Sequence, residues 1–157
     1  MTLLDLQATP FDLQQGDLVQ AKVTATNNYG DSAISDANTA GALIETVPHI
    51  PTIAPTRGSN TGETQVEVII TPLTGLETGG SPITSYVILW DQGLGGAFSV
   101  LKGDVTPNLD TTNLFTSGIT SGTVYRFAYY AKNAHGDGWD GVQILPEVSI
   151  LAGTTPS

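Results

Sequence analysis

Apolar and polar residues alternate along several short stretches of this chain, and a period of two residues predicts β-strands. No window of about a dozen residues keeps the three-and-four spacing of an amphipathic helix. The alternating apolar positions, in chain order, are Val66, Val68 and Ile70; Tyr86, Ile88 and Trp90; Tyr125, Phe127, Tyr129 and Ala131; and Val142, Ile144, Val148 and Ile150. The pattern predicts an all-β fold.

Turn-forming residues separate these stretches. Residues 78–82 read Thr-Gly-Gly-Ser-Pro and residues 93–96 read Gly-Leu-Gly-Gly, both of which favour tight turns. Short strands separated by such turns within about 100 residues are typical of two antiparallel sheets packed face to face. We therefore expect a β-sandwich.

The chain also repeats itself. The stretch 13–19 is similar to 119–125, and 25–31 is similar to 131–137; both comparisons have an offset of 106 residues, as between Gly16 and Gly122. Two separate stretches in one register indicate an internal repeat. The second copy, residues 48–157, is predicted to be complete, whereas the first, residues 1–47, is predicted to hold only the C-terminal strands of a repeat.

The first copy is expected to contain about three strands without the earlier strands that would cover them. Pro48, Pro51 and Pro55 mark the junction between the copies. An uncovered apolar face with open edges is unfavourable in water. Two explanations stay open: the chain is a piece of a longer array, or another chain supplies the missing strands by β-strand addition.

Characteristic residues recur at fixed spacing in the second copy. Residues 80–88 read Gly-Ser-Pro-Ile-Thr-Ser-Tyr-Val-Ile, and the later positions are Ile119, Gly122, Tyr125, Phe127, Ala131, Asn133 and Gly136. With these elements, residues 49–157 resemble the fibronectin type III domain, and the first copy resembles its last strands. The resemblance implies a seven-stranded, immunoglobulin-like β-sandwich preceded by a partial repeat.

Several of these residues have a structural role that the resemblance implies. Tyr125 suits a tyrosine corner, in which the hydroxyl bonds back to the connecting backbone. Asn133 and Gly136 suit the turn after the long strand, because both tolerate left-handed backbone geometry. The chain departs from the family pattern at two places: Ile70 stands near a position where many members have tryptophan, and Val19 replaces the corner tyrosine in the first copy.

A candidate binding surface is predicted from the residues of two strands, within 86–90 and 125–131, that alternate with the core-facing residues. Where one set of alternating residues faces the core, the other set faces outward, and the two strands are neighbours in the fibronectin-like topology. The outward residues are Val87, Leu89, Ala128 and Tyr130. Apolar surface patches often mark protein contacts, so these four residues are predicted to form a protein interface.

Catalytic and metal-binding patterns are weak in this sequence. His49 lies in the junction and His135 in a turn, and no Gly-x-Ser-x-Gly elbow accompanies His135 and Asp137. Residues 135–141 read His-Gly-Asp-Gly-Trp-Asp-Gly, but the ligand order and the bidentate glutamate of a calcium loop are missing. We therefore expect no enzyme activity, no cofactor and no metal site.

One tripeptide resembles an integrin-recognition sequence. Lys102-Gly103-Asp104 matches that type, but in the fibronectin family the recognition loop lies between the last two strands, where this chain has Asp137 to Gly141. Three-residue matches are frequent by chance, and a structural connection is the preferred interpretation.

Composition narrows the choice of partners. The formal net charge is −10, and charged residues make up only 13% of the 157 residues. Such a chain repels nucleic acid and anionic membrane surfaces. Cysteine is absent, which excludes disulfides and thiolate chemistry. The first residues form no signal peptide, and no apolar run approaches the about 20 residues of a membrane helix.

Together these features predict a non-catalytic structural or adhesive module that binds protein. The repeat and the low charge favour a tandem array in a large extracellular or cell-surface protein. Two alternatives remain: a spacer domain of a secreted enzyme, and a subunit of an extracellular filament completed by strands from a neighbour. Self-association is an expected form of partner binding.

Overall fold

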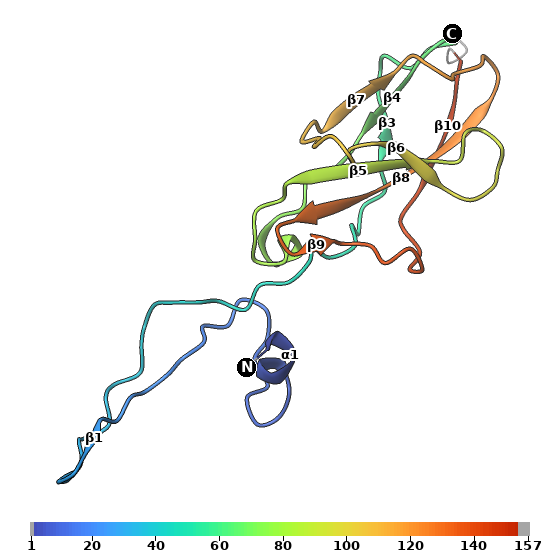
Figure 1. Ribbon diagram of the computed structural model, residues 1–157. Helices are drawn as coiled ribbons and strands as arrows, with labels where there is room; N and C mark the ends of the chain where they lie inside the picture. Colours follow the sequence, from blue (N-terminus) through green and yellow to red (C-terminus); the bar gives the residue numbers. More distant parts are fainter. Residues whose placement is uncertain (1, 154–157) are drawn as a thin grey trace. The chain divides into compact units, whose positions relative to one another are not determined.

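The computed structural model describes residues 2–153, and the chain divides into two compact units, Met1–Thr46 and Val47–Ser157 (Figure 1). Each unit is described by itself. Within residues 2–153, no helix is long and apolar enough to span a membrane.

The second unit is built from two antiparallel sheets. The first has the strand order β3–β4–β7, with β3 at Thr56–Arg57, β4 at Val66–Ile69 and β7 at Thr112–Phe115. The second has the order β10–β8–β5–β6, with β5 at Ser85–Trp90, β6 at Ser99–Lys102, β8 at Val124–Asn133 and β10 at Val148–Leu151. A short strand, β9 (Gly136–Asp137), also pairs with β8, and the 3-10 helix η1 (Gly75–Thr78) lies between β4 and β5.

The predicted alternation places one parity of each strand in a common core between the two sheets. The buried members of this core include Val66, Val68, Ile70, Tyr86, Ile88, Tyr125, Phe127, Tyr129, Ala131 and Ile150, with Trp90 packed against them. The rings of Phe115 and Phe127 stack across the sheets at 6.1 Å between centroids. The all-β sandwich predicted from the sequence is confirmed.

The tyrosine corner predicted at Tyr125 is present. The Thr120 N–H donates to the Tyr125 hydroxyl oxygen at 2.8 Å, and the Tyr125 hydroxyl donates to the Gly118 carbonyl at 3.1 Å. Tyr125 is 2% exposed, so these two bonds supply partners for the hydroxyl of a buried side chain. They fasten the loop before β8 to the strand itself.

The turn after β8 differs in detail from the prediction. Gly136 has a φ of +131°, which disfavours any side chain. Asn133 contributes through its side chain instead of through left-handed backbone: its Oδ1 accepts from the His135 N–H at 2.8 Å, and its Nδ2 donates to the Thr78 carbonyl at 3.0 Å. The asparagine therefore closes the turn and attaches it to η1.

The outer face of β5 and β8 is covered, contrary to prediction. The four residues expected to face a partner are instead buried, and together with Leu145 they form a second apolar cluster. The four residues are Val87, Leu89, Ala128 and Tyr130. The partly buried side chains of Ile50, Phe98 and Trp139 pack against this cluster. Their exposed fractions are 0%, 2%, 0% and 5%. Parity was correctly predicted, since these side chains point away from the main core, but the prediction that they face solvent is wrong.

The cover comes from an interruption of the last strand. The sequence predicts one strand that includes Val142 and Ile144, but these residues are 84% and 94% exposed and lie in no strand. Instead, β8 pairs with β9 at one end and with β10 at the other, and residues 138–147 leave the sheet between them. The ring of Trp139 lies 5.6 Å from that of Tyr130, centroid to centroid.

Side-chain hydrogen bonds hold the departing segment in its turn. The Asp140 Oδ1 accepts from the N–H groups of Val142 and Gln143 at 2.9 and 3.1 Å. The Trp139 Nε1–H donates to the Gln143 carbonyl at 2.8 Å. The backbone N–H groups bonded to Asp140 hold the pKa of its carboxyl below the usual range. The turn positions Trp139 and Leu145 over the sheet.

The first unit contains a short helix and one long hairpin. The helix α1 (Leu3–Gln7) begins with a capping box between Thr2 and Asp5. The hairpin ends in two-residue strands, β1 (Thr26–Asn27) and β2 (Gly30–Asp31), which pair antiparallel. The expectation of about three strands is therefore wrong, since the described part of this unit holds one helix and two short strands. That this unit is the remainder of a repeat stays a prediction.

Candidate functional site: the edge strand β6 and its pocket

Strand β6 forms one edge of the larger sheet in the second unit. It pairs with β5 on one side, with Leu89 opposite Val100 and Trp90 opposite Ser99, and the register shifts between Ile88 and Leu89. Among the described residues, no strand pairs with its other side. An edge strand presents unpaired backbone N–H and C=O groups to which another extended segment can bond.

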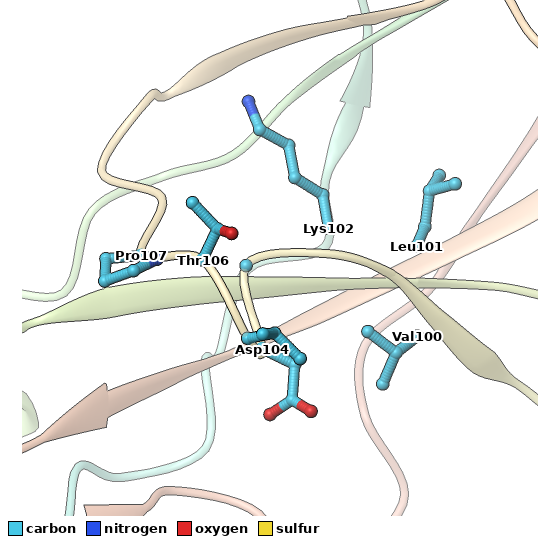
Figure 2. Close-up of a pocket in the computed structure, with 8 residues that line it drawn as sticks. Val100, Leu101, Lys102, Asp104, Thr106 and Pro107 are labelled. Atoms are coloured by element: carbon cyan, nitrogen blue, oxygen red, sulfur yellow. The ribbon is translucent and has the colours of Figure 1, made fainter.

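A pocket of about 480 Å³ lies beside this edge (Figure 2). Strand β6 and the following loop line it, through residues Val100, Leu101, Lys102, Gly103, Asp104, Val105, Thr106 and Pro107. Val100 is 50% exposed and Val105 is 93% exposed. Two exposed valines next to an open edge are the combination in which a bound strand gains both backbone bonds and an apolar contact.

The loop that lines the pocket is attached firmly to β5. The Ser85 Oγ donates to the Gly103 carbonyl at 2.6 Å and accepts from the Asn108 N–H at 2.9 Å. The Asn108 carbonyl in turn accepts from the Tyr86 N–H at 2.7 Å. Gly103 has a φ of +95°, and a Cβ at this position would collide with the Tyr86 carbonyl oxygen. The pocket is therefore supported by fixed backbone.

The tripeptide Lys102-Gly103-Asp104 lies on the pocket wall with both charged groups engaged. The Lys102 Nζ lies 3.0 Å from Asp110 Oδ2, and the Asp104 Oδ1 lies 2.9 Å from Lys132 Nζ. Lys102 and Asp104 point to opposite sides of the chain (Figure 2). The hydrogen bond to Asp104 is the main cause that raises the pKa of Lys132. This arrangement fits a structural connection better than a presented recognition sequence.

The other candidate residues lie in separate places. His49 precedes β3, and its N–H donates to the Glu77 carbonyl at 2.9 Å; His135 lies in the β8–β9 turn. Asp137, one acid of the glycine-rich loop, pairs with Lys132 at 3.2 Å. Within the part of the chain that the structure describes, no three His, Asp or Glu side chains are grouped so that they could hold a metal ion.

No pattern in the sequence predicts the pocket. Val100 belongs to no clear alternation of apolar and polar residues. Val105 lies in a polar stretch that ends in Thr106 and Pro107. An isolated exposed valine is ordinary on a protein surface. Only the pairing of β6 with β5 shows that these residues stand at the edge of a sheet.

No protein-family model matches this chain, and no curated protein matches it significantly. Solved structures do match. Titin domains A168–A170 are 19% identical with a TM-score of 0.53, and the match covers 83% of this chain and 39% of that one. The fourth FNIII domain of a human protein is 15% identical with a TM-score of 0.49, and the match covers 85% of this chain and 98% of that domain. The FN1–FN3 domains of chicken contactin are 19% identical with a TM-score of 0.47, and the match covers 86% of this chain and 42% of that one.

The chain thus spans about two fifths of the titin fragment that it matches. At 19% identity, the titin match indicates a shared architecture, and the activity has to be argued from the site. A three-stranded and a five-stranded sheet around a buried core, with a tyrosine corner, agree with that architecture. The chain therefore contains an all-β sandwich with the fibronectin type III-like fold.

Proposed function

We propose that this chain is a non-catalytic protein-interaction module of structural or adhesive type, taken from a tandem array in a large extracellular or cell-surface protein. One observation carries the binding role: the open edge of β6 lies beside a pocket of about 480 Å³ lined by Val100 and Val105. The fold, the internal repeat in the sequence and the low fraction of charged residues support the setting.

Binding at this site combines two contributions. An extended segment of a partner adds to β6 as a further strand, and its backbone bonds with the edge supply affinity that does not depend on sequence. An apolar side chain of the same segment enters the pocket and supplies specificity. The net charge of −10 favours a partner segment that is neutral or basic.

Peptide selection tests the site directly. Random decapeptides are selected for binding to the full chain, and the enriched peptides are then measured by fluorescence anisotropy against three variants. Val100→Asp and Val105→Asp place a charge at the pocket and are expected to weaken binding at least about tenfold. Val142→Asp is the matched control, since Val142 is also a highly exposed valine of the second unit, and it is expected to leave binding unchanged.

Two results would contradict the proposal. One is that no peptide is enriched over a blank support. The other is that the enriched peptides bind all three variants equally, which would place the binding surface elsewhere on the chain.

A further inference from the structure

The hairpin of the first unit repeats several hydrogen bonds of β8, β9 and β10. The sequence offset is 106 along the first arm and at the tip, and 108 at the base of the second arm. We call residues 13–44 the N-terminal ribbon. In β1 and β2 of the ribbon, Asn27 pairs with Gly30; in β8 and β9, Asn133 pairs with Gly136. The Asn27 Oδ1 accepts from the Tyr29 N–H at 2.8 Å, as Asn133 does from His135 at the same distance.

The match is found again next to the tip and at the base of the ribbon, on either side of the segment 138–147 that leaves the sheet. The corresponding backbone bonds, ribbon first, are Ser32 N–H to Ala25 O and Gly138 N–H to Ala131 O, both 2.8 Å; Ile44 N–H to Asp17 O and Ala152 N–H to Thr123 O, both 2.9 Å; and Gly16 N–H to Ile44 O at 2.9 Å and Gly122 N–H to Ala152 O at 2.8 Å. The ribbon therefore has the backbone of the last two strands of the sandwich.

Within residues 2–153, no strand pairs with the edge of the ribbon that corresponds to the β5 side of β8. In the second unit, the carbonyls of Arg126 and Lys132 on this edge accept from Asp91 and Thr84. In the ribbon, within residues 2–153, the backbone groups of Gln20, Lys22 and Thr24 on this edge take part in no hydrogen bond. An unpaired edge of this kind is a template for a further strand.

The ribbon face that corresponds to the core is also uncovered. The matching positions of β8 are at most 2% exposed. In the ribbon they are Val19, which is partly exposed, and Ala21, Val23 and Ala25, which are exposed, Val23 by 67%. The second unit shows what covers such a face, namely β5 on the edge and the sheet of β3, β4 and β7 on the other side of the core.

We propose that the N-terminal ribbon binds the complementary half of a fibronectin type III-like sandwich, a partner segment of the kind that residues 48–117 form in the second unit. The partner adds a strand of the β5 type to the edge at Gln20, Lys22 and Thr24, and its second sheet covers the small side chains of the ribbon. Because Val19, Ala21 and Val23 are smaller than Tyr125, Phe127 and Tyr129, the best partner carries larger core side chains than β4 and β5 do.

The test uses the full chain and residues 48–117 of this same sequence as a separate polypeptide probe. These residues contain β3 to β7, which cover β8 and β10 in the second unit. Binding is followed by amide hydrogen exchange. We expect the exchange of the Gln20, Lys22 and Thr24 amides to slow at least about tenfold when the probe is added.

Two proline variants separate the proposed edge from the other one. Thr24→Pro removes an N–H from the proposed edge without touching the ribbon's own bonds, and is expected to weaken probe binding at least about tenfold. Asp36→Pro is the matched control on the opposite arm, where the Asp36 N–H makes no hydrogen bond within the described residues. It is expected to change binding less than threefold.

A fusion protein keeps the test valid where the separate probe aggregates. Residues 48–117 are joined in front of Asp12, which reproduces the order that precedes Gly118 in the second unit. We expect a second cooperative unfolding transition and slowed exchange in the ribbon. If the ribbon amides of this fusion exchange as fast as in the original chain, the proposal is overturned. It is also overturned if the original chain alone dimerises through the same amides, because the occupant is then a second copy.

Discussion

The hydroxyl of Tyr125 connects the loop before β8 to the strand, and its two hydrogen bonds are partly buried. Tyr125→Phe removes both bonds and leaves the Thr120 N–H and the Gly118 carbonyl without this partner. We expect a loss of about 1–2 kcal/mol in the free energy of unfolding, measured by urea denaturation.

Tyr29→Phe is the control for this substitution, because Tyr29 is 99% exposed. It is expected to change the free energy of unfolding by less than about 0.5 kcal/mol. Equal effects of the two substitutions would show that the corner hydroxyl contributes nothing beyond the ring.

Asp91, directly after β5, is a buried carboxylate that should make the sandwich sensitive to acid. Burial by itself would raise the pKa of Asp91. The hydrogen bonds from the N–H groups of Arg126 and Gly93, and from the Arg126 side chain, outweigh that effect and hold the pKa below its usual value. The Arg126 Nε lies 3.1 Å from Asp91 Oδ2.

The direction of the pH effect follows from this lowered pKa. Because the folded state binds the Asp91 proton more weakly than the unfolded state, the stabilisation is complete above an unfolded-state pKa of about 3.9 and is lost as pH falls through the lower folded-state pKa. The free energy of unfolding should therefore fall more steeply below about pH 4 in the wild type than in Asp91→Asn. Parallel pH profiles of the two proteins would contradict this account.

At the scale of elements, the interrupted last strand explains how the outer face of the sheet is kept from water. Leu145 is 5% exposed and belongs to the cluster with Val87, Leu89 and Ala128. Leu145→Ala opens a cavity over this face, and we expect a loss of about 2–4 kcal/mol in the free energy of unfolding.

Ile144→Ala provides the control for Leu145→Ala at the next position. Ile144 is 94% exposed, so its truncation should cost less than about 0.5 kcal/mol. Thermal denaturation of both variants checks the prediction. If Leu145→Ala is as stable as Ile144→Ala, the segment 138–147 does not cover the sheet in solution.

Local patterns were sufficient to predict the strands of the core but not the cover over the outer face. The parity of Val87 and Tyr130 was visible in the sequence, whereas their burial depends on Trp139, Leu145 and Phe98, which come from other segments. The alternation also made the predicted last strand too long, because Val142 has the same parity as Val148, where β10 begins. The hydrogen bonds of Asp140 turn the chain away before that pattern can continue.

The edge of β6 shows a similar limit at the candidate site. The sequence marked Lys102 and Asp104 because their letters match a recognition tripeptide, but ion pairs engage both side chains. Val100 and Val105 became candidates only once their place at an open edge was known. Surface sites of this kind depend on strand order, which short-range patterns do not specify.

At the scale of the whole molecule, the chain combines one closed sandwich with a ribbon that has the backbone of its last strands. Gly16, Asn27 and Gly30 occupy the same turn and base positions as Gly122, Asn133 and Gly136. The repeat was visible in the sequence because these residues are required by backbone geometry. The sequence analysis did not predict helix α1, because five residues are too few to show a helical period.

Residue-resolved amide hydrogen exchange on the full chain tests this central claim most directly. The account predicts strong protection in β4, β5 and β8, near that of global unfolding, and protection at least about a hundredfold weaker at the ribbon amides of Val19, Ser32 and Ser35. It also predicts no protection at Gln20, Lys22 and Thr24 in the absence of a partner. Equal protection in the ribbon and in β8 would contradict the account, because it would mean that the ribbon is already covered.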